Sequence, residues 1–282
     1  MSQGYVHGYG EREGERLLDQ ATTLAELLYG DLRFPPGSRV LEAGCGVGAQ
    51  TEFLARGSPG ARFTCVDVSA DSIARARQRA DAAGLGNVAF ERADLLRLPA
   101  RLGVFDHVFV CFVLEHLSDP AAALASLNCA LRLGGTLTVI EGDHGSAFFH
   151  PDDARACRAI ELLIRLQSEE GGDANIGRRL RPLLEGAGFC DVSVAPRTVY
   201  ADAGRPALVE GFTRNTFTAM VEGVRDAVLS RRLMTPEDWE AAIGALHSTA
   251  EPDGSFCYTF FRAAATRPSV PQPGTPQAPA GT

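Results

Sequence analysis

The sequence predicts an α/β protein built on a mostly parallel β-sheet. Short apolar segments alternate with amphipathic, helix-like segments through the first half of the chain, which is typical of βαβ units with right-handed crossovers. Residues 105–112 form an apolar run interrupted only by Asp106 and His107, as expected for a strand buried on both faces. With 282 residues, 45% of them apolar, the chain can form one large domain or a core domain with an insertion.

The elements of the first half follow in a regular order. Leucine and alanine at helical spacing predict a first helix over residues 15–29, which ends near Gly30. Further helices are expected over residues 49–56 and 121–131. Between them, another helix is expected to begin at the cap residue Ser69 or Asp71 and to end at residue 83. The predicted strands are residues 39–42, 62–67, 87–91, 105–112 and 136–141.

The pattern changes after Glu141. Helices are expected over residues 151–169 and 176–186, and strands over 188–200 and 255–263. Residues 205–247 are mostly helical and apolar, too long for an ordinary loop, so they are expected to cover a site. Prolines recur from Pro268 to Pro279 and predict a disordered tail. The expected organisation is an N-terminal helical lid segment (1–37), a core (38–264) with a helical cap insertion (about 201–250) and the tail (265–282).

Charge and residue usage exclude several functions. The net charge is −8, so the chain lacks the electrostatic footprint of a nucleic-acid or anionic-membrane binder. It contains no lysine, which excludes a Schiff-base lysine and a phosphate loop that ends in Gly-Lys. The seven cysteines are scattered, with no C-x-x-C pair, which favours a reducing cytoplasm over a zinc or disulfide framework. Neither a secretory signal nor an apolar run of roughly 20 residues is found, so membrane insertion is not expected.

The most informative segment is the turn after the first predicted strand, residues 42–48, with the sequence Glu-Ala-Gly-Cys-Gly-Val-Gly. Glycines allow a tight turn and let a ligand lie against bare backbone where the next helix begins. Asp67 ends the second strand, where a carboxylate accepts hydrogen bonds from ribose hydroxyls. Asp94 follows the third strand, where a carboxylate can accept from an exocyclic amine. These features at the carboxyl ends of three successive strands predict a ligand site.

Together, these motifs resemble those of the class I S-adenosylmethionine-dependent methyltransferases, specifically the small-molecule branch that contains the ubiquinone and menaquinone methylases. The resemblance covers roughly residues 40–141 and includes residues 105–108, 114–117 and 131–137. Leu133 stands where the family normally has a proline, which should affect loop rigidity and not chemistry. The resemblance implies a Rossmann-like, doubly wound, mostly parallel seven-stranded sheet of order 3-2-1-4-5-7-6, whose last strand is antiparallel.

The resemblance also implies a site for S-adenosylmethionine and its product S-adenosylhomocysteine. Glu42 and the glycine turn would lie near the methionine part, Asp67 would hold the ribose, and Val68 and Asp94 would contact the adenine. An acidic cleft suits a cationic cofactor, and no metal is expected. The residues assigned to the cofactor are Glu42, Gly44, Gly46, Asp67, Val68, Asp94, Leu95 and Cys111.

Methyl transfer from a sulfonium is an in-line displacement, in which placing the acceptor does most of the work. An acceptor hydroxyl, or a carbon that must lose a proton, also needs a base. His116 is one candidate, because the resemblance places it beside the methyl group; its alternative is a helix-start histidine bonded to a backbone carbonyl. Glu141 and His144, at the end of the fifth strand, are the others, unless that segment is a solvated loop.

The acceptor contacts expected from these considerations are Tyr9, Phe112, Glu115 and Arg178. Tyr9 would act as a lid residue and Arg178 would bind an anionic group, although a frayed terminus and a surface arginine are the alternatives. A small natural-product or quinone-like acceptor is expected, methylated on O, C or N, and a homodimer is an open option. Two other functions stay open: an NAD-dependent oxidoreductase, which usually has G-x-G-x-x-G where this chain has Ala49 after Gly48, and a non-catalytic S-adenosylmethionine-binding protein.

Overall fold

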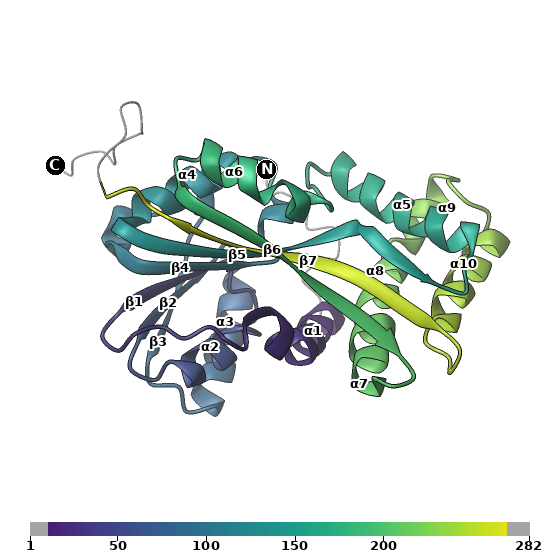
Figure 1. Ribbon diagram of the computed structural model, residues 1–282, viewed down its shortest axis with the longest axis horizontal. Helices are drawn as coiled ribbons and strands as arrows, with labels where there is room; N and C mark the ends of the chain where they lie inside the picture. Colours follow the sequence, from purple (N-terminus) through teal and green to yellow (C-terminus); the bar gives the residue numbers. More distant parts are fainter. Residues whose placement is uncertain (1–10, 270–282) are drawn as a thin grey trace.

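A computed structural model describes residues 11–269, in which a seven-stranded mixed sheet carries helices on both faces (Figure 1). The strand order is β3-β2-β1-β4-β5-β7-β6, and β7 is antiparallel to both β5 and β6. The predicted doubly wound fold and its strand order are therefore confirmed. The strands are β1 Arg39–Ala43, β2 Arg62–Asp67, β3 Val88–Arg92, β4 Phe105–Cys111, β5 Leu131–His150, β6 Cys190–Asp202 and β7 Ser255–Thr266.

Helices α1 to α3 cover one face of the sheet, and α4 and α6 cover the other (Figure 1). Of the two predicted caps of α3, Ser69 and Asp71, it is Ser69 whose side chain accepts a hydrogen bond from the Ser72 amide. The helices are α1 Glu11–Tyr29, α2 Thr51–Gly57, α3 Ala70–Ala82, α4 Pro120–Ala130, α5 Ala154–Glu169, α6 Leu180–Gly186, α7 Pro206–Leu208, α8 Ala219–Glu222, α9 Arg225–Ser230 and α10 Pro236–Ser248. The 3-10 turns are η1 Leu95–Arg97, η2 Ala100–Leu102, η3 Leu114–His116 and η4 Ile176–Arg179, and η5 Val209–Thr218 is a π-helix.

Strand β5 is much longer than predicted. It spans 20 residues and continues past Glu141 to His150. The glycines at 142 and 145 gave this segment the composition of a loop, but its antiparallel pairing with β7 continues through Asp143 and resumes at Phe148 after a register shift. Glu141 and His144 therefore lie inside a strand, because backbone pairing with a distant segment overrides the local turn signal.

The long strands β5, β6 and β7 extend beyond β1–β4, and helices α5 and α8–α10 gather around this extension (Figure 1). The segment predicted as a cap is helical and runs from α7 through η5 to α10. Its buried side chains share one apolar cluster with the sheet, since Phe212 and Trp239 belong to the same cluster as Phe63 and Phe109. The segment is thus packed onto the sheet extension as part of the main core.

Two of the predictions concern residues at the ends of the chain, a lid tyrosine and a proline-rich tail. Tyr9 and most of the predicted tail, from residue 270 on, lie outside the described residues. Ala265 and Thr266 belong to β7, so the last strand runs past the predicted start of the tail. Between residues 11 and 269, no helix is long and apolar enough to cross a bilayer.

Candidate active site

The glycine turn after β1 is tied to the neighbouring strand and open on one side. The amides of Gly44 and Cys45 both donate to the Val66 carbonyl, at 2.8 and 2.9 Å. Gly44 and Gly46 have φ angles of 76° and 51°, a left-handed conformation that favours glycine. A Cβ at Gly44 would lie 2.5 Å from the Val113 side chain, whereas a Cβ at Gly46 would meet nothing within 4 Å. The turn therefore packs against the segment after β4 and leaves bare backbone facing open space.

Two carboxylates flank this turn, one buried and one half-buried. Glu42 is 2% exposed, and its Oε2 accepts a hydrogen bond from the Thr51 hydroxyl at 2.7 Å. Burial raises the pKa of Glu42 to about 7. Asp67 accepts from the Gly46 amide at 2.9 Å and from the Ser69 amide at 2.8 Å, so it holds the turn against the end of β2. Burial also raises the pKa of Asp67, although these amide hydrogen bonds oppose the shift.

The remaining residues assigned to the cofactor lie at the ends of β2, β3 and β4. Val68 is 53% exposed beside the half-buried Asp67, so it presents an apolar surface. Asp94 is exposed and accepts from the Leu96 amide at 2.9 Å, which starts η1, while Leu95 is buried. Cys111 is buried at the end of β4. Open backbone at Gly46, carboxylates close to it and an exposed apolar side chain fit a cationic, nucleoside-containing cofactor.

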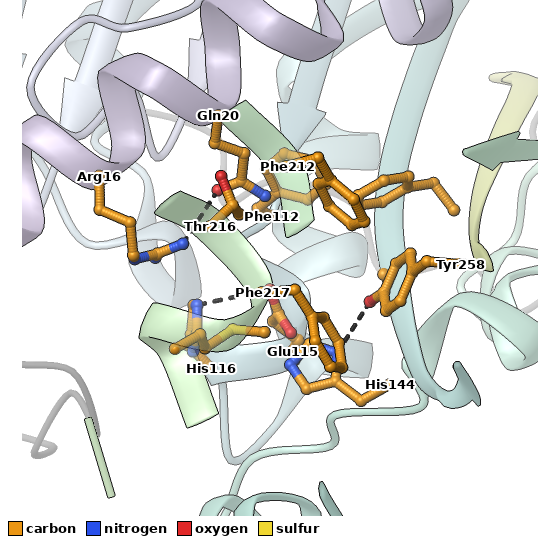
Figure 2. Close-up of a pocket in the computed structure, with 13 residues that line it drawn as sticks. Arg16, Gln20, Phe112, Glu115, His116, His144, Phe212, Thr216, Phe217 and Tyr258 are labelled. Atoms are coloured by element: carbon orange, nitrogen blue, oxygen red, sulfur yellow. Dashed lines mark hydrogen bonds and ion pairs between the residues drawn. The ribbon is translucent and has the colours of Figure 1, made fainter. Parts of the chain in front are cut away.

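A second feature is a small cavity, which is shown in Figure 2. Phe112 contributes to its wall, and the next residue, Val113, is the one that Gly44 approaches. The φ angle of Phe112 is 58°, which is rare for an aromatic residue and reorients the chain directly after β4. The cavity measures about 40 Å³, room for only a few water molecules. Its five aromatic rings are those of Phe112, Phe212, Phe217, Tyr258 and Phe260.

His144 lies in the cavity wall with one ring nitrogen paired and the other unpaired. Its Nδ1 is 2.8 Å from the Tyr258 hydroxyl, and Figure 2 shows the two side chains facing each other. Its Nε2 is buried and has no hydrogen-bond partner among residues 11–269. Burial lowers the pKa of His144, partly opposed by the nearby Glu115 carboxylate. The imidazole is therefore neutral at neutral pH.

Glu115 and His116 bring further polar groups to the same wall. The Glu115 side chain is buried, and its Oε1 lies 3.6 Å from His116 Nε2. The Gln167 amide donates to the Glu115 backbone carbonyl at 3.1 Å and approaches its carboxylate at 3.4 Å. Burial raises the pKa of Glu115, while His144 and the Gln167 hydrogen bond favour the charged form. Arg16 and Gln20 of α1 complete the polar part of the lining.

The structure does not bring Glu141 or Arg178 to this cavity. Glu141 is fully buried, and its Oε1 accepts from the amides of Val113 and Leu114 at 3.0 and 2.8 Å, so it anchors the turn that carries Glu115. Burial raises the pKa of Glu141 to about 8, and the Glu115 carboxylate adds to this shift. Arg178 forms a bidentate pair with Asp143, at 2.7 and 2.5 Å, and its side chain is half exposed.

Sequence reasoning missed much of the cavity wall. Tyr258 and Phe260 come from β7, and Phe212, Thr216, Phe217 and Met220 come from η5 and α8. One available signal was the period-two pattern of Phe256, Tyr258 and Phe260, which places three aromatic rings on the same face of the last strand.

Comparison with known proteins adds an independent finding: residues 40–135 match the model of a family described as a methyltransferase domain. Residues 40–135 thus form a methyltransferase domain, and the chain is similar to class I S-adenosylmethionine-dependent methyltransferases. The cofactor class of this methyltransferase-family protein is accordingly S-adenosylmethionine, and the oxidoreductase alternative receives no support. Within the part that the structure describes, no cluster of three or more His, Cys, Asp or Glu side chains is placed to hold a metal ion.

Three relatives illustrate the range of the family. An uncharacterized 37.1 kDa protein in transposon TN4556 of Streptomyces fradiae is 34% identical over 76% of this chain and 61% of its own length. The S-adenosyl-L-methionine-dependent Diels-Alderase iccD of Talaromyces variabilis is 33% identical over 60% of this chain and 59% of its own. The 27-O-demethylrifamycin SV methyltransferase of Amycolatopsis mediterranei is 32% identical over 47% and 49%. The chain thus matches about half to three-fifths of the length of these relatives.

A solved structure shares the fold. The crystal structure of the 4+2 cyclase SpnF superposes with a TM-score of 0.54 at 20% identity, and the match covers 89% of this chain and 80% of that one. The fold shared with this cyclase therefore extends beyond residues 40–135 to most of the chain.

Proposed function

We propose that this methyltransferase-family protein transfers a methyl group from S-adenosylmethionine to a small, largely apolar acceptor bound in the aromatic cavity. The observation that carries this proposal is the contact between the glycine turn and the cavity wall. Gly44 packs against Val113, and Phe112 beside it lines the cavity. A ligand on the bare backbone of the turn and a molecule in the cavity would thus be neighbours, as an in-line displacement requires.

Different side chains would contact the cofactor and the acceptor. Bound S-adenosylmethionine supplies an electrophilic methyl group on a sulfonium sulfur. The carboxylates of Glu42 and Asp67 offer negative charge and hydrogen-bond acceptors to this cation and its ribose. On the other side, the aromatic rings exclude water, and His144 and Glu115 provide polar groups close to where the acceptor would react.

An unsaturated natural product or quinone-like molecule is the acceptor class that we infer. Flat aromatic walls suit a flat ring, and the rifamycin-type substrate in the name of the Amycolatopsis relative supports a natural product. Because the cavity measures about 40 Å³, we expect α1 and η5 to move apart when an acceptor binds. All seven cysteines are free, which supports a reducing, cytoplasmic environment.

Calorimetric titration with S-adenosylmethionine and S-adenosylhomocysteine tests the cofactor half of the proposal. We expect Asp67→Ala to weaken binding by about 1–3 kcal/mol, because charge-assisted hydrogen bonds are lost. Asp71→Ala is the matched control, since Asp71 is an exposed carboxylate in the first turn of α3 and should leave binding unchanged. Equal affinity of the wild-type protein and the Asp67 variant would contradict the assignment.

A panel of phenols, enols and amines, with S-adenosylhomocysteine release as the readout, tests methyl transfer. Release that depends on one of these acceptors is the expected result. Tight cofactor binding without release for any acceptor would instead favour a use of the cofactor without methyl transfer, as the Diels-Alderase name of the Talaromyces relative suggests.

A further inference from the structure

We infer that Tyr258 and His144 form a dyad that takes the proton from a hydroxyl acceptor, a phenol or an enol, with Tyr258 as the residue that positions and orients the imidazole. This inference rests on the proposed function and narrows its acceptor class. It adds Tyr258, which lies 114 residues from His144 in the sequence.

The Tyr258 hydroxyl is held in one place by its surroundings. Tyr258 is 2% exposed, and its ring lies 5.5 Å from Phe212, 5.4 Å from Phe217 and 4.7 Å from Phe260, measured between centroids. A Cβ at Gly142 would lie 2.4 Å from the Tyr258 oxygen. Only glycine at this position of β5 leaves room for the hydroxyl, which is therefore directed at the imidazole of His144.

This contact determines what the other imidazole nitrogen can do. When the Tyr258 oxygen accepts a hydrogen bond from Nδ1–H, Nε2 of the neutral ring carries the lone pair. Nε2 is the buried nitrogen without a partner in the described chain, in a residue that lines the cavity. In the tautomer with the proton on Nδ1, it can therefore accept a proton from a molecule bound there.

One charged neighbour, Glu115, favours the imidazolium that proton uptake would produce, whereas burial disfavours it. Glu115 raises the proton affinity of His144, whereas His116 and Arg16 oppose it. Glu115 has the largest influence of these charged neighbours, and its residue is buried and lines the same cavity as His144. The Glu115 carboxylate does not attract a neutral imidazole, so it stabilises His144 only as the ring takes up the proton.

The reaction balances with groups already named. The acceptor O–H proton passes to His144 Nε2, the oxygen lone pair forms the bond to the methyl carbon, and the electrons of the C–S bond return to sulfur, which leaves S-adenosylhomocysteine. The proton then leaves His144 for solvent. A neutral amine can attack before it loses a proton, so a hydroxyl acceptor requires a base placed at this point and an amine does not.

Nitrogen-15 NMR of the histidine rings tests the dyad without any acceptor, with the His144 signals identified by their loss in His144→Gln. At neutral pH we expect the proton of the wild-type His144 ring to lie on Nδ1 and not on Nε2. Tyr258→Phe removes the hydroxyl but keeps the aromatic ring and its packing, so we expect it to change how the proton is shared between the two nitrogens. Tyr29→Phe is the matched control, because Tyr29 is equally buried and its hydroxyl donates to the Ala21 carbonyl at 2.7 Å. A proton on Nε2 in the wild type, or an unchanged distribution in Tyr258→Phe, would overturn the dyad.

Turnover of the same panel tests the acceptor class. With a phenol or enol acceptor, we expect kcat to fall by 10²- to 10⁴-fold in His144→Gln and by about tenfold in Tyr258→Phe, with unchanged cofactor binding. The rising limb of the pH profile should disappear in His144→Gln. If amines are methylated and hydroxyl compounds are not, this inference fails and the proposed function stands. If nothing is methylated, the proposed function itself fails.

Discussion

Glu42 shows how the environment of a single residue changes its chemistry. The residue lies on β1, next to the glycine turn, with hydrogen bonds from the Thr51 hydroxyl and, at 3.3 Å, from the Cys65 thiol. These bonds favour the carboxylate, but the cost of burying a charge is larger and raises its pKa to about 7. Glu42 therefore carries a proton about half of the time at neutral pH while no cation is bound.

This protonation predicts that cofactor binding releases a proton. A sulfonium cation close to Glu42 favours the carboxylate, lowers its pKa and drives off about half a proton per site at pH 7. Calorimetric titrations in two buffers of different ionisation enthalpy measure this release, which should be largest below pH 7, between the pKa values of the free and the cofactor-bound protein, should decline at higher pH and should vanish in Glu42→Gln. Glu52→Gln is the control, because Glu52 lies at the surface of α2 and pairs with Arg56 and Arg79. Proton release that persists in Glu42→Gln would show that another group is responsible.

The roof of the cavity depends on how closely two helices pack against each other. It is formed by α1 and η5, which meet where Gly211 faces Thr23: a Cβ at Gly211 would lie 2.1 Å from Thr23 Oγ1 and 3.1 Å from Thr23 Cβ. η5 is a ten-residue π-helix, a rare conformation that often occurs at functional sites. The separation of these two helices therefore controls the size of the cavity.

We predict that Gly211→Ala forces α1 and η5 apart. The new methyl group overlaps a short, branched side chain, so the free energy of unfolding should fall by about 1–3 kcal/mol. Gly244→Ala in α10 is the matched control: it is also a helical glycine, and its Cβ would meet nothing within 4 Å. That variant should gain about 0.5–1 kcal/mol from helix propensity. Urea denaturation of both variants provides the comparison, and a stabilised Gly211→Ala protein would show that the two helices do not pack closely in solution.

Across the whole molecule, the sheet extension and its helices are joined to the cofactor-binding half by one apolar cluster. Trp239 of α10 and Phe109 of β4 both belong to it and are 1% exposed. Since such a continuous core leaves no weakly packed boundary, we expect the two halves to unfold together.

The single tryptophan tests this cooperativity directly. Trp239 is the only tryptophan in the chain, so its fluorescence reports on the sheet extension, whereas circular dichroism reports on all helices and strands. Both signals should give the same urea midpoint. Phe109→Ala, a change in the distant strand β4, should lower both midpoints equally, for a loss of about 3–5 kcal/mol. A tryptophan transition at lower urea than the circular dichroism transition would instead indicate a separately unfolding cap.

The sequence alone determined the features that depend on local chemistry. Strand and helix periodicity placed most elements within a few residues, and Ser69 was one of two candidates for a helix cap. The glycine turn with Glu42 and Asp67 could be predicted because positive φ angles require glycine, and because the carboxyl ends of adjacent parallel strands share one edge of the sheet. The ordered motifs from Val40 to Glu141 were enough to indicate the family.

Only the tertiary structure decided which side chains form the cavity. The β5–β7 register continues through Asp143, which turned a presumed loop into a strand and set His144 beside Tyr258. It also placed Glu141 under the amides after β4 instead of in the cavity. Such contacts join segments more than a hundred residues apart, and a shift of one residue in strand register would turn each side chain to the opposite face. No local pattern encodes that register, because it is decided by the packing of the complete sheet and the helices around it.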